Sequence, residues 1–177
     1  TFDGTVYNAN QQLYTAGVDH NIDGGAQTTL TSTNDSITFA RAVKLANGSD
    51  LVVNSGGGAI SLGTIDGTSS ADVTLNAVAG TVSVEAIGTI TANGINTVAI
   101  TGSTITLNGG ITTSNIATNS VTLTGNIALA AAAIGSARPD HIPSPTGCSY
   151  TSEVDACSVA LTDQAVVTTY SELDSPK

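Results

Sequence analysis

Pairs of apolar residues that alternate with small polar residues recur along the middle of the chain at a nearly constant interval. One column of pairs recurs roughly every 22 to 23 residues and comprises Ile37/Phe39, Ile60/Leu62, Val82/Val84, Ile105/Leu107 and Ile127/Leu129. Another column keeps nearly the same interval, apart from one longer step after Val73/Leu75, and comprises Leu51/Val53, Val73/Leu75, Val98/Ile100 and Val121/Leu123. A looser third column comprises Val43/Leu45, Ile65, Ile87/Ile90 and Ile111. Alternation with a period of two is typical of strands, so each repeat predicts three short strands.

Residues that favour turns separate these predicted strands. They include Asn47-Gly48, Gly56-Gly57-Gly58, Asp66-Gly67, Asn93-Gly94 and Asn108-Gly109-Gly110. Strands that return at a constant interval can each pair with their equivalents one repeat away, at a spacing of about 4.8 Å. The pattern therefore predicts an all-β fold, a three-sided parallel β-solenoid (β-helix) with coils of about 22 residues. The alternative is an antiparallel sandwich, whose strands also recur, roughly every 8 to 12 residues.

The composition divides the chain into three parts. Residues 1–25 follow the pattern poorly and hold Phe2, Tyr7 and Tyr14, which predicts an N-terminal cap or an imperfect first coil. Residues 26–135 form the predicted solenoid. Residues 136–177 contain all four prolines and both cysteines, and they are expected to form an irregular C-terminal cap or tail.

The charge balance excludes several classes of function. The chain of 177 residues has a formal charge of −10, with 4 basic and 14 acidic residues. Binding of nucleic acid needs clustered cations, so nucleic acid is not an expected partner. No apolar run reaches the roughly 18 residues of a membrane-spanning helix, so insertion into a membrane is not expected either.

Candidate catalytic groups are sparse, and we expect no enzyme. His20 and His141 both lie outside the repeat, and the chain has no G-x-S-x-G motif. Asp50 and Asp72 stand one repeat apart, each directly before an apolar pair of the column through Leu51, so they are expected to stack on adjacent coils. Such a carboxylate pair either shares a metal or has a raised pKa, and the alternative is that it consists of two solvated turn residues.

Residues 19–24 match the start of a calcium-binding loop, with Asp19, Asn21 and Asp23 at alternate positions. These side chains carry the oxygen ligands that calcium prefers. However, Leu30 stands where such a loop needs a bidentate glutamate. Calcium is therefore the one candidate cofactor, and a polar turn at the start of the solenoid is the alternative.

The tail holds the two cysteines, Cys148 and Cys157, which predict a local disulfide in an exported chain, with two free thiols as the alternative. Strand-like runs surround Val159/Leu161 and Val166/Val167. These runs are expected to form an irregular last coil or a strand that pairs with a neighbouring molecule.

The outward positions of the column through Ile37 and Phe39 predict a flat, uncharged surface rich in hydroxyl groups. This surface comprises Ser36, Thr38, Ser61, Thr81, Ser83, Thr104 and Thr106. Such an array resembles the ice-matching faces of solenoid antifreeze proteins, although Ala59, Asn126 and Ala128 interrupt it. The alternative is that threonine is simply a favoured residue on solvated strands.

The repeat segments Asp72–Ala77, Gly102–Gly109 and Val121–Gly125 resemble the repeats of filamentous-haemagglutinin-like bacterial surface proteins. The resemblance covers roughly residues 27 to 130. It implies an exported β-helical rod, extracellular or at the cell surface, that serves as a stalk, adhesin or fibre. The chain is much shorter than such proteins usually are, and its tail is foreign to the repeat.

A solenoid has an exposed strand edge at each end, and such edges are either capped or joined to another copy. We therefore expect a non-enzymatic extracellular structural protein, a filament subunit or adhesin stalk that stacks head to tail with itself. Surface glycans of a host or the environment are further expected partners. The alternative function is binding of ice or glycans by the flat Thr/Ser surface.

Overall fold

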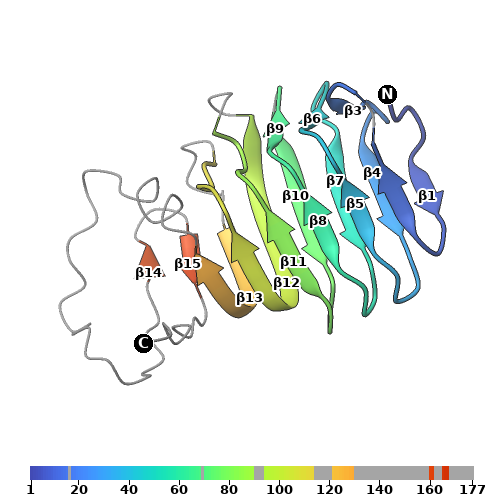
Figure 1. Cartoon of the computed structure of the whole chain (residues 1–177). Helices are drawn as coiled ribbons and strands as arrows, with labels where there is room; N and C mark the ends of the chain where they lie inside the picture. Colours follow the sequence, from blue (N-terminus) through green and yellow to red (C-terminus); the bar gives the residue numbers. More distant parts are fainter. Residues whose placement is uncertain are drawn as a thin grey trace, which may run out of the picture.

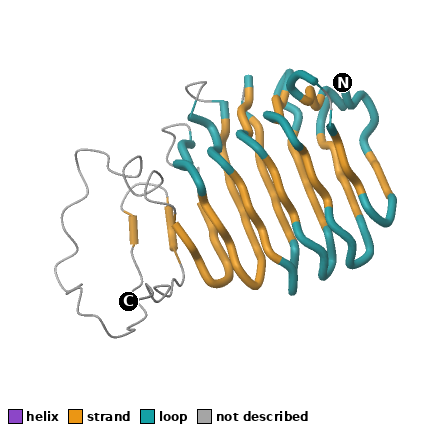
Figure 2. The backbone as a smooth tube through the Cα atoms, in the orientation of Figure 1, coloured by secondary structure: helices purple, strands orange, loops and turns teal. Residues whose placement is uncertain are grey.

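The computed structural model describes residues 1–15, 17–68, 70–89, 94–113, 121–129, 160–161 and 165–167. The described residues form strands and connecting loops, and they contain no helix. All pairings among β1 to β13 are parallel, which confirms the solenoid and rules out the antiparallel sandwich. Figure 1 shows successive strands side by side from the N-terminal end to β13, and Figure 2 shows the same winding of the backbone.

The first column of strands runs along the whole rod. Its members are β1 (Val6–Asn8), β4 (Gln27–Thr31), β7 (Asp50–Asn54), β10 (Ala71–Asn76) and the first parts of β12 (Ile95–Leu107) and β13 (Val121–Leu129). Six strands stacked at about 4.8 Å span roughly 24 Å. The register aligns one inward residue from each strand: Tyr7, Leu30, Val53, Leu75, Ile100 and Leu123.

The second column lies one corner further along each coil. Its members are β2 (Gln12–Tyr14), β5 (Ile37–Phe39), β8 (Ile60–Leu62), β11 (Thr81–Val84) and the second parts of β12 and β13. The register aligns Gln12, Ile37, Ile60, Val82, Ile105 and Ile127. From Ile37 onward, these are the pairs that the sequence periodicity predicts.

The third column is shorter. It comprises β3 (His20–Ile22), β6 (Val43–Leu45) and β9 (Ile65–Gly67), and it continues as single bridges from Ile65 to Ile87 and from Ile87 to Ile111. Residues 1–22 therefore supply one strand to each column, and Phe2 adds a further bridge to Ile22.

The core is a thin stack of aliphatic side chains, with Leu51, Val73 and Ile105 among those that are fully buried. Burying one such side chain contributes about 1.5–3 kcal/mol. Each inward position contacts its equivalents one coil above and below. The narrow interior suits Ile, Leu and Val, which explains why a chain without tryptophan builds a continuous core.

Glycine and serine form the corner between the first and second columns. The Ser55 hydroxyl donates a hydrogen bond to the carbonyl of Gly58 at 2.6 Å. A Cβ atom at Gly80 would lie 2.0 Å from the Gly58 carbonyl oxygen, and one at Gly125 would lie 1.9 Å from that of Gly102. Backbones of neighbouring coils therefore touch at this corner, and only glycine fits.

The turn prediction is right at Asn47-Gly48, where both residues have positive φ angles, but wrong at Asp66-Gly67. Asp66 and Gly67 lie in β9 and are buried. A Cβ atom at Gly67 would lie 2.2 Å from the carbonyl oxygen of Gly94. Gly67 thus allows two coils to approach closely rather than turning the chain.

Two short strands of the tail are described, β14 (Ala160–Leu161) and β15 (Ala165–Val167). β15 pairs in parallel with residues 121–123 of β13, and β14 pairs antiparallel with β15. The predicted disulfide between Cys148 and Cys157 lies outside the described residues, as does His141.

Candidate functional site

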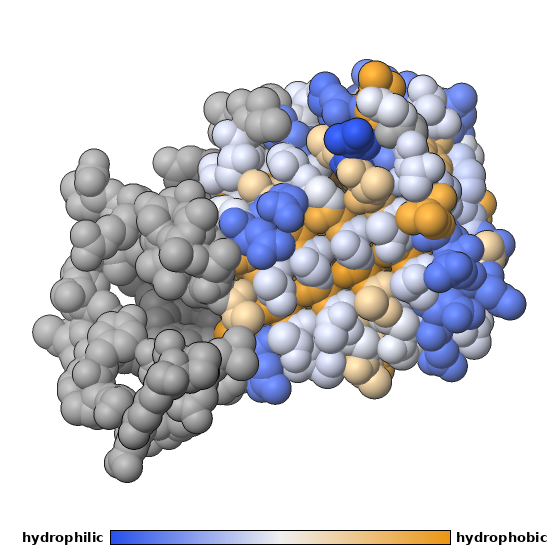
Figure 3. Space-filling view, in the orientation of Figure 1, coloured by the Kyte–Doolittle hydropathy of each residue, from blue (hydrophilic) through white to orange (hydrophobic). Residues whose placement is uncertain are grey.

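The hydroxyl-bearing residues lie in register on the outside of the second column. One outer row comprises Thr38, Ser61, Ser83, Thr106 and Ala128. In the neighbouring row, Thr81, Thr104 and Asn126 are aligned, and Ser36 and Ala59 directly precede the aligned residues Ile37 and Ile60. Neighbours are about 4.8 Å apart along the rod and about 6.6 Å apart along a strand. Figure 3 shows such pale rows of side chains running from coil to coil on the side that faces the viewer.

A second polar row lies outside the first column and was not singled out from the sequence. It comprises Asn8, Thr31, Asn54, Asn76, Thr101 and Thr124. The signal was present, because every residue that follows an inward residue of this column must point outward. The row beside it is less polar: it comprises Val6, Thr29, Val52, Thr74, Ala99 and Thr122.

The calcium candidates do not converge on one point. Asn21 lies in the middle of β3, and its side chain is exposed. Asp19 and Asp23 directly flank this strand, one at each end, and a strand advances about 3.3 Å per residue. Extended backbone of this kind does not wrap around an ion.

Each of the two carboxylates has another partner. Asp19 forms an ion pair with Lys44, with 2.5 Å between Oδ2 and Nζ, and this hydrogen bond raises the pKa of Lys44. Asp23 accepts a hydrogen bond of 2.8 Å from the side-chain amide of Asn47. These contacts join the first coil to the second. They give the two carboxylates the structural role expected of a polar turn at the start of the solenoid.

Asp50 and Asp72 stack on adjacent coils as expected, but they bind backbone rather than each other. Asp50 Oδ1 accepts a hydrogen bond of 2.8 Å from the amide of Asp72. Asp72 Oδ1 accepts one of 3.0 Å from the amide of Thr97. Each carboxylate therefore caps the first strand of the next coil, which satisfies an amide at the corner.

The N-terminal end of the core is aromatic, unlike the aliphatic middle. The Phe2 ring packs edge-on against Tyr7 and Tyr14, with centroids 5.1 and 4.9 Å apart, and it also contacts Phe39. Phe2, Tyr7 and Tyr14 are only partly buried, since no described coil covers them from outside. This aromatic layer, Phe2, Tyr7, Tyr14 and His20, closes the open end of the stack.

Hydrogen bonds hold the polar side chains of this layer. The Gln12 amide donates to the carbonyl of Thr31 at 2.7 Å, and the Tyr14 hydroxyl donates to Gln12 Oε1 at 2.7 Å. Burial raises the pKa of Tyr14, and Tyr7 adds to that shift. The layer is therefore apolar toward the core and hydrogen-bonded toward its rim.

His20 points inward from the start of the third column and is 4% exposed. Its Nε2 atom is buried without a hydrogen-bond partner. Burial lowers the pKa of His20, and the N-terminal ammonium acts in the same direction. The Asp19 carboxylate and the Tyr14 carbonyl oppose that shift. The ring is therefore held neutral among Phe2, Tyr14 and Phe39.

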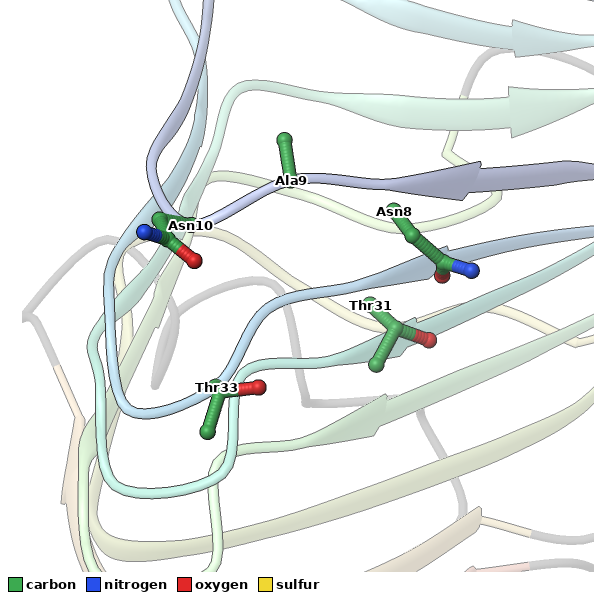
Figure 4. Close-up of a pocket in the computed structure, with 5 residues that line it drawn as sticks. All are labelled: Asn8, Ala9, Asn10, Thr31 and Thr33. Atoms are coloured by element: carbon green, nitrogen blue, oxygen red, sulfur yellow. The ribbon is translucent and has the colours of Figure 1, made fainter.

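A shallow polar hollow of about 420 Å³ lies at the first corner of the N-terminal coil. It is lined by Asn8, Ala9, Asn10, Thr31 and Thr33, which Figure 4 shows at the ends of the first two strands of the first column. Its lining carries amides and hydroxyls but no titratable group, so it offers hydrogen bonds without acid–base chemistry.

Within the described residues, no three His, Cys, Asp or Glu side chains gather to hold a metal ion. Nor does that part of the chain contain a helix long and apolar enough to cross a membrane. The chain matches no protein-family model, no curated protein and no solved structure. Its parallel strand pairing and its regular repeat identify it as a β-helical repeat protein.

Proposed function

We propose that this protein is a non-enzymatic structural rod, extracellular or at the cell surface, that serves as a filament subunit or adhesin stalk. The observation that carries the proposal is the continuous parallel register of the first column from β1 to β13. The resemblance of the repeats to filamentous-haemagglutinin-like surface proteins supports the same role.

The stacking direction suits a load-bearing element. The slanted hydrogen bonds of a parallel pair connect each coil to the next, so they link the rod along its length. Each coil contacts only its neighbours, so length can be added without a change in cross-section. Flat outer rows of threonine, serine and asparagine remain solvated along that length.

The net charge of the chain disfavours contact between rods that lie side by side. A formal charge of −10 on 177 residues gives repulsion between rods that approach laterally. Contacts end to end bring fewer of these charges together. Assembly along the axis is therefore favoured over lateral clumping.

Negative-stain electron microscopy of the purified chain over a series of concentrations tests the filament role. We expect unbranched filaments of one uniform width, which lengthen as the concentration rises. Sedimentation velocity checks the same series in solution. Discrete short particles at every concentration would contradict a filament subunit and leave the stalk role.

A second candidate is recognition of an ordered surface, ice or a glycan, by the two hydroxyl rows of the second column. Their alignment in register favours this candidate, although Ala59 and Ala128 interrupt the rows. It predicts thermal hysteresis or glycan retention that Thr106→Tyr abolishes. Thr74→Tyr, on the first column, is the matched control and should leave binding unchanged.

A further inference from the structure

The two ends of the rod form a joint between copies. Resting on the filament role proposed above, we infer that the free edge of β1 in one copy pairs in parallel with the outer edge of β13 in a second copy. We also infer that β15 occupies that edge of β13 until the second copy displaces it.

The edge of β1 is ready to accept a strand. Thr29 donates its amide hydrogen to the carbonyl of Thr5, and Ala9 donates to that of Thr31. In a parallel pair, alternate residues bond to opposite sides, so the amides and carbonyls of Val6 and Asn8 point away from β4. Val6 is also 61% exposed, which makes this edge both unpaired and partly apolar.

The edge of β13 already accepts a parallel strand. Val121, Thr122 and Leu123 pair with β12 on one side and with β15 on the other. Among the described strands, none pairs with residues 126–129 on the side away from β12. β15 therefore covers only the part of β13 that belongs to the first column.

The first corner is shorter in the first coil and in β12 and β13 than in the coils between them. The inward residues on either side of the first corner are five residues apart in the first coil, at Tyr7 and Gln12. They are four apart in β13, at Leu123 and Ile127. In the three coils that contain β4, β7 and β10 the interval is seven. Both ends thus have the tight form of this corner.

Continuing the register across the joint places Leu123 over Tyr7 of the second copy and Ile127 over its Gln12. This arrangement covers the half-exposed aromatic layer with aliphatic side chains. Two columns of the second copy, β1 and β2, would then pair with β13. β15 occupies only three register positions, so a second copy has more pairing to offer than the strand it displaces.

The tail strand β15 determines the protein concentration at which the joint forms. β15 is held on the same chain, so it competes at a fixed effective concentration, while a second copy competes at the bulk concentration. Assembly should therefore start only above a threshold of protein concentration. Added salt should lower this threshold, because it screens the repulsion between acidic copies.

Val6→Pro tests the β1 side of the joint. Proline removes the amide that faces the free edge, and its ring blocks a strand there, while the bonds to β4 do not use this amide. We expect the threshold for filaments, measured by sedimentation and electron microscopy, to rise about tenfold or more. Val6→Thr keeps the amide and is the matched control, with filaments as in the wild type. Circular dichroism checks that both variants remain folded.

Val166→Pro combined with Val167→Pro tests the β13 side. Because consecutive amides point to opposite sides, this pair of substitutions removes one bond from β15 to β13 whichever residue makes it. Release of β15 should lower the filament threshold. Loss of filaments in this variant would instead make the tail the connector between copies and overturn the inference.

The remaining outcomes separate the inference from the proposed function. Filaments that form equally well in Val6→Pro would overturn the joint and leave the filament role intact. Absence of filaments in both the wild type and the Val166→Pro/Val167→Pro variant would overturn both. Filaments in that variant alone would support the joint but contradict the filament role of the wild type, because β15 then keeps the wild-type edge of β13 closed.

Discussion

The first coil and the middle coils use the same winding but fill it differently. In the middle, aliphatic residues such as Ile60 and Val82 lie between equivalents on both sides and are almost fully buried. In the first coil, Gln12, Tyr14 and His20 take the corresponding inward positions. Figure 3 shows hydrophilic residues gathered at the end of the rod where this coil lies.

This difference shows which side chains suit the last layer of a solenoid core. A middle layer of the core has an apolar layer on both sides, so any aliphatic side chain of suitable volume and shape fits it. An end layer has an apolar layer on one side only, so a side chain that is apolar in its body and polar at its tip suits it better.

Replacing Ile105 by aspartate should unfold the rod. The substitution buries an unpaired carboxylate in the middle of the core, at a cost of at least about 4 kcal/mol. Leu13→Asp is the control, because Leu13 is in the first coil and 62% exposed. Thermal melting by circular dichroism should show loss of the transition in the first variant only. Equal melting curves would refute the assignment of the core.

Gly80→Ala should destabilise the rod by about 1–3 kcal/mol, since the added methyl group overpacks a backbone contact. The new Cβ atom would lie 2.0 Å from the carbonyl oxygen of Gly58. Gly17→Ala, in the first coil, is the control, because nothing lies within 4 Å of its Cβ position. Chemical denaturation measures both variants, and equal stabilities would show that coils can separate at this corner.

Tyr14→Phe should loosen the first coil without affecting the middle ones. It removes the hydrogen bond to Gln12 Oε1, at a cost of about 1 kcal/mol. Hydrogen exchange should speed up in β1 to β3 and stay unchanged in β8 and β11. The comparison variant is Tyr7→Phe, whose hydroxyl accepts a bond from the exposed Gly4 amide and should matter less. Uniform loss of protection along the rod would mean that the ends and the middle open together.

The first coil should also lose stability as the pH falls. The pKa of His20 is lowered in the folded chain, so below its ordinary value of about 6.5 the unfolded chain binds more protons than the folded one. Stability is therefore complete above that pH and declines as the pH falls through the folded pKa.

Hydrogen exchange in β3 at pH 7.5 and pH 5.5, corrected for the intrinsic rate, measures this effect. His20→Leu should remove the dependence on pH, whereas His141→Gln should retain it. The same pH dependence in His20→Leu would refute the assignment of the effect to His20.

Much of this architecture could be predicted from the sequence, because period and alternation report directly on stacking. The columns through Ile37 and Leu51 are confirmed, as is the parallel pairing. The first coil was ambiguous, because its inward positions carry Gln12 and His20, which break an apolar pattern. Gln12 points inward and bonds to the carbonyl of Thr31, and His20 points inward and bonds to the backbone of Tyr14. A local sequence pattern does not reveal these hydrogen bonds.

The sites were harder to predict than the fold. Spacing placed Asp50 and Asp72 on adjacent coils, but it could not show that each carboxylate binds the amide of the next coil. The motif at Asp19 to Asp23 has the composition of a loop, yet pairing with Lys44 and its neighbours keeps it extended. In each case long-range pairing decides the conformation, and a short motif does not encode it.

The one long step in the first column, from Val73 to Val98, shows how such a chain can grow. Two of its three additional residues lie between Ile87 and Ile95, and the third is a bulge before Val98. The interval is ordinary again where β11 and β12 pair, with Val82 opposite Ile105, because the first corner of that coil is two residues shorter. A segment inserted between the third and first columns therefore leaves the neighbouring coils unchanged. New surface features can thus arise there by insertion, one coil at a time, while the rest of the rod is inherited intact.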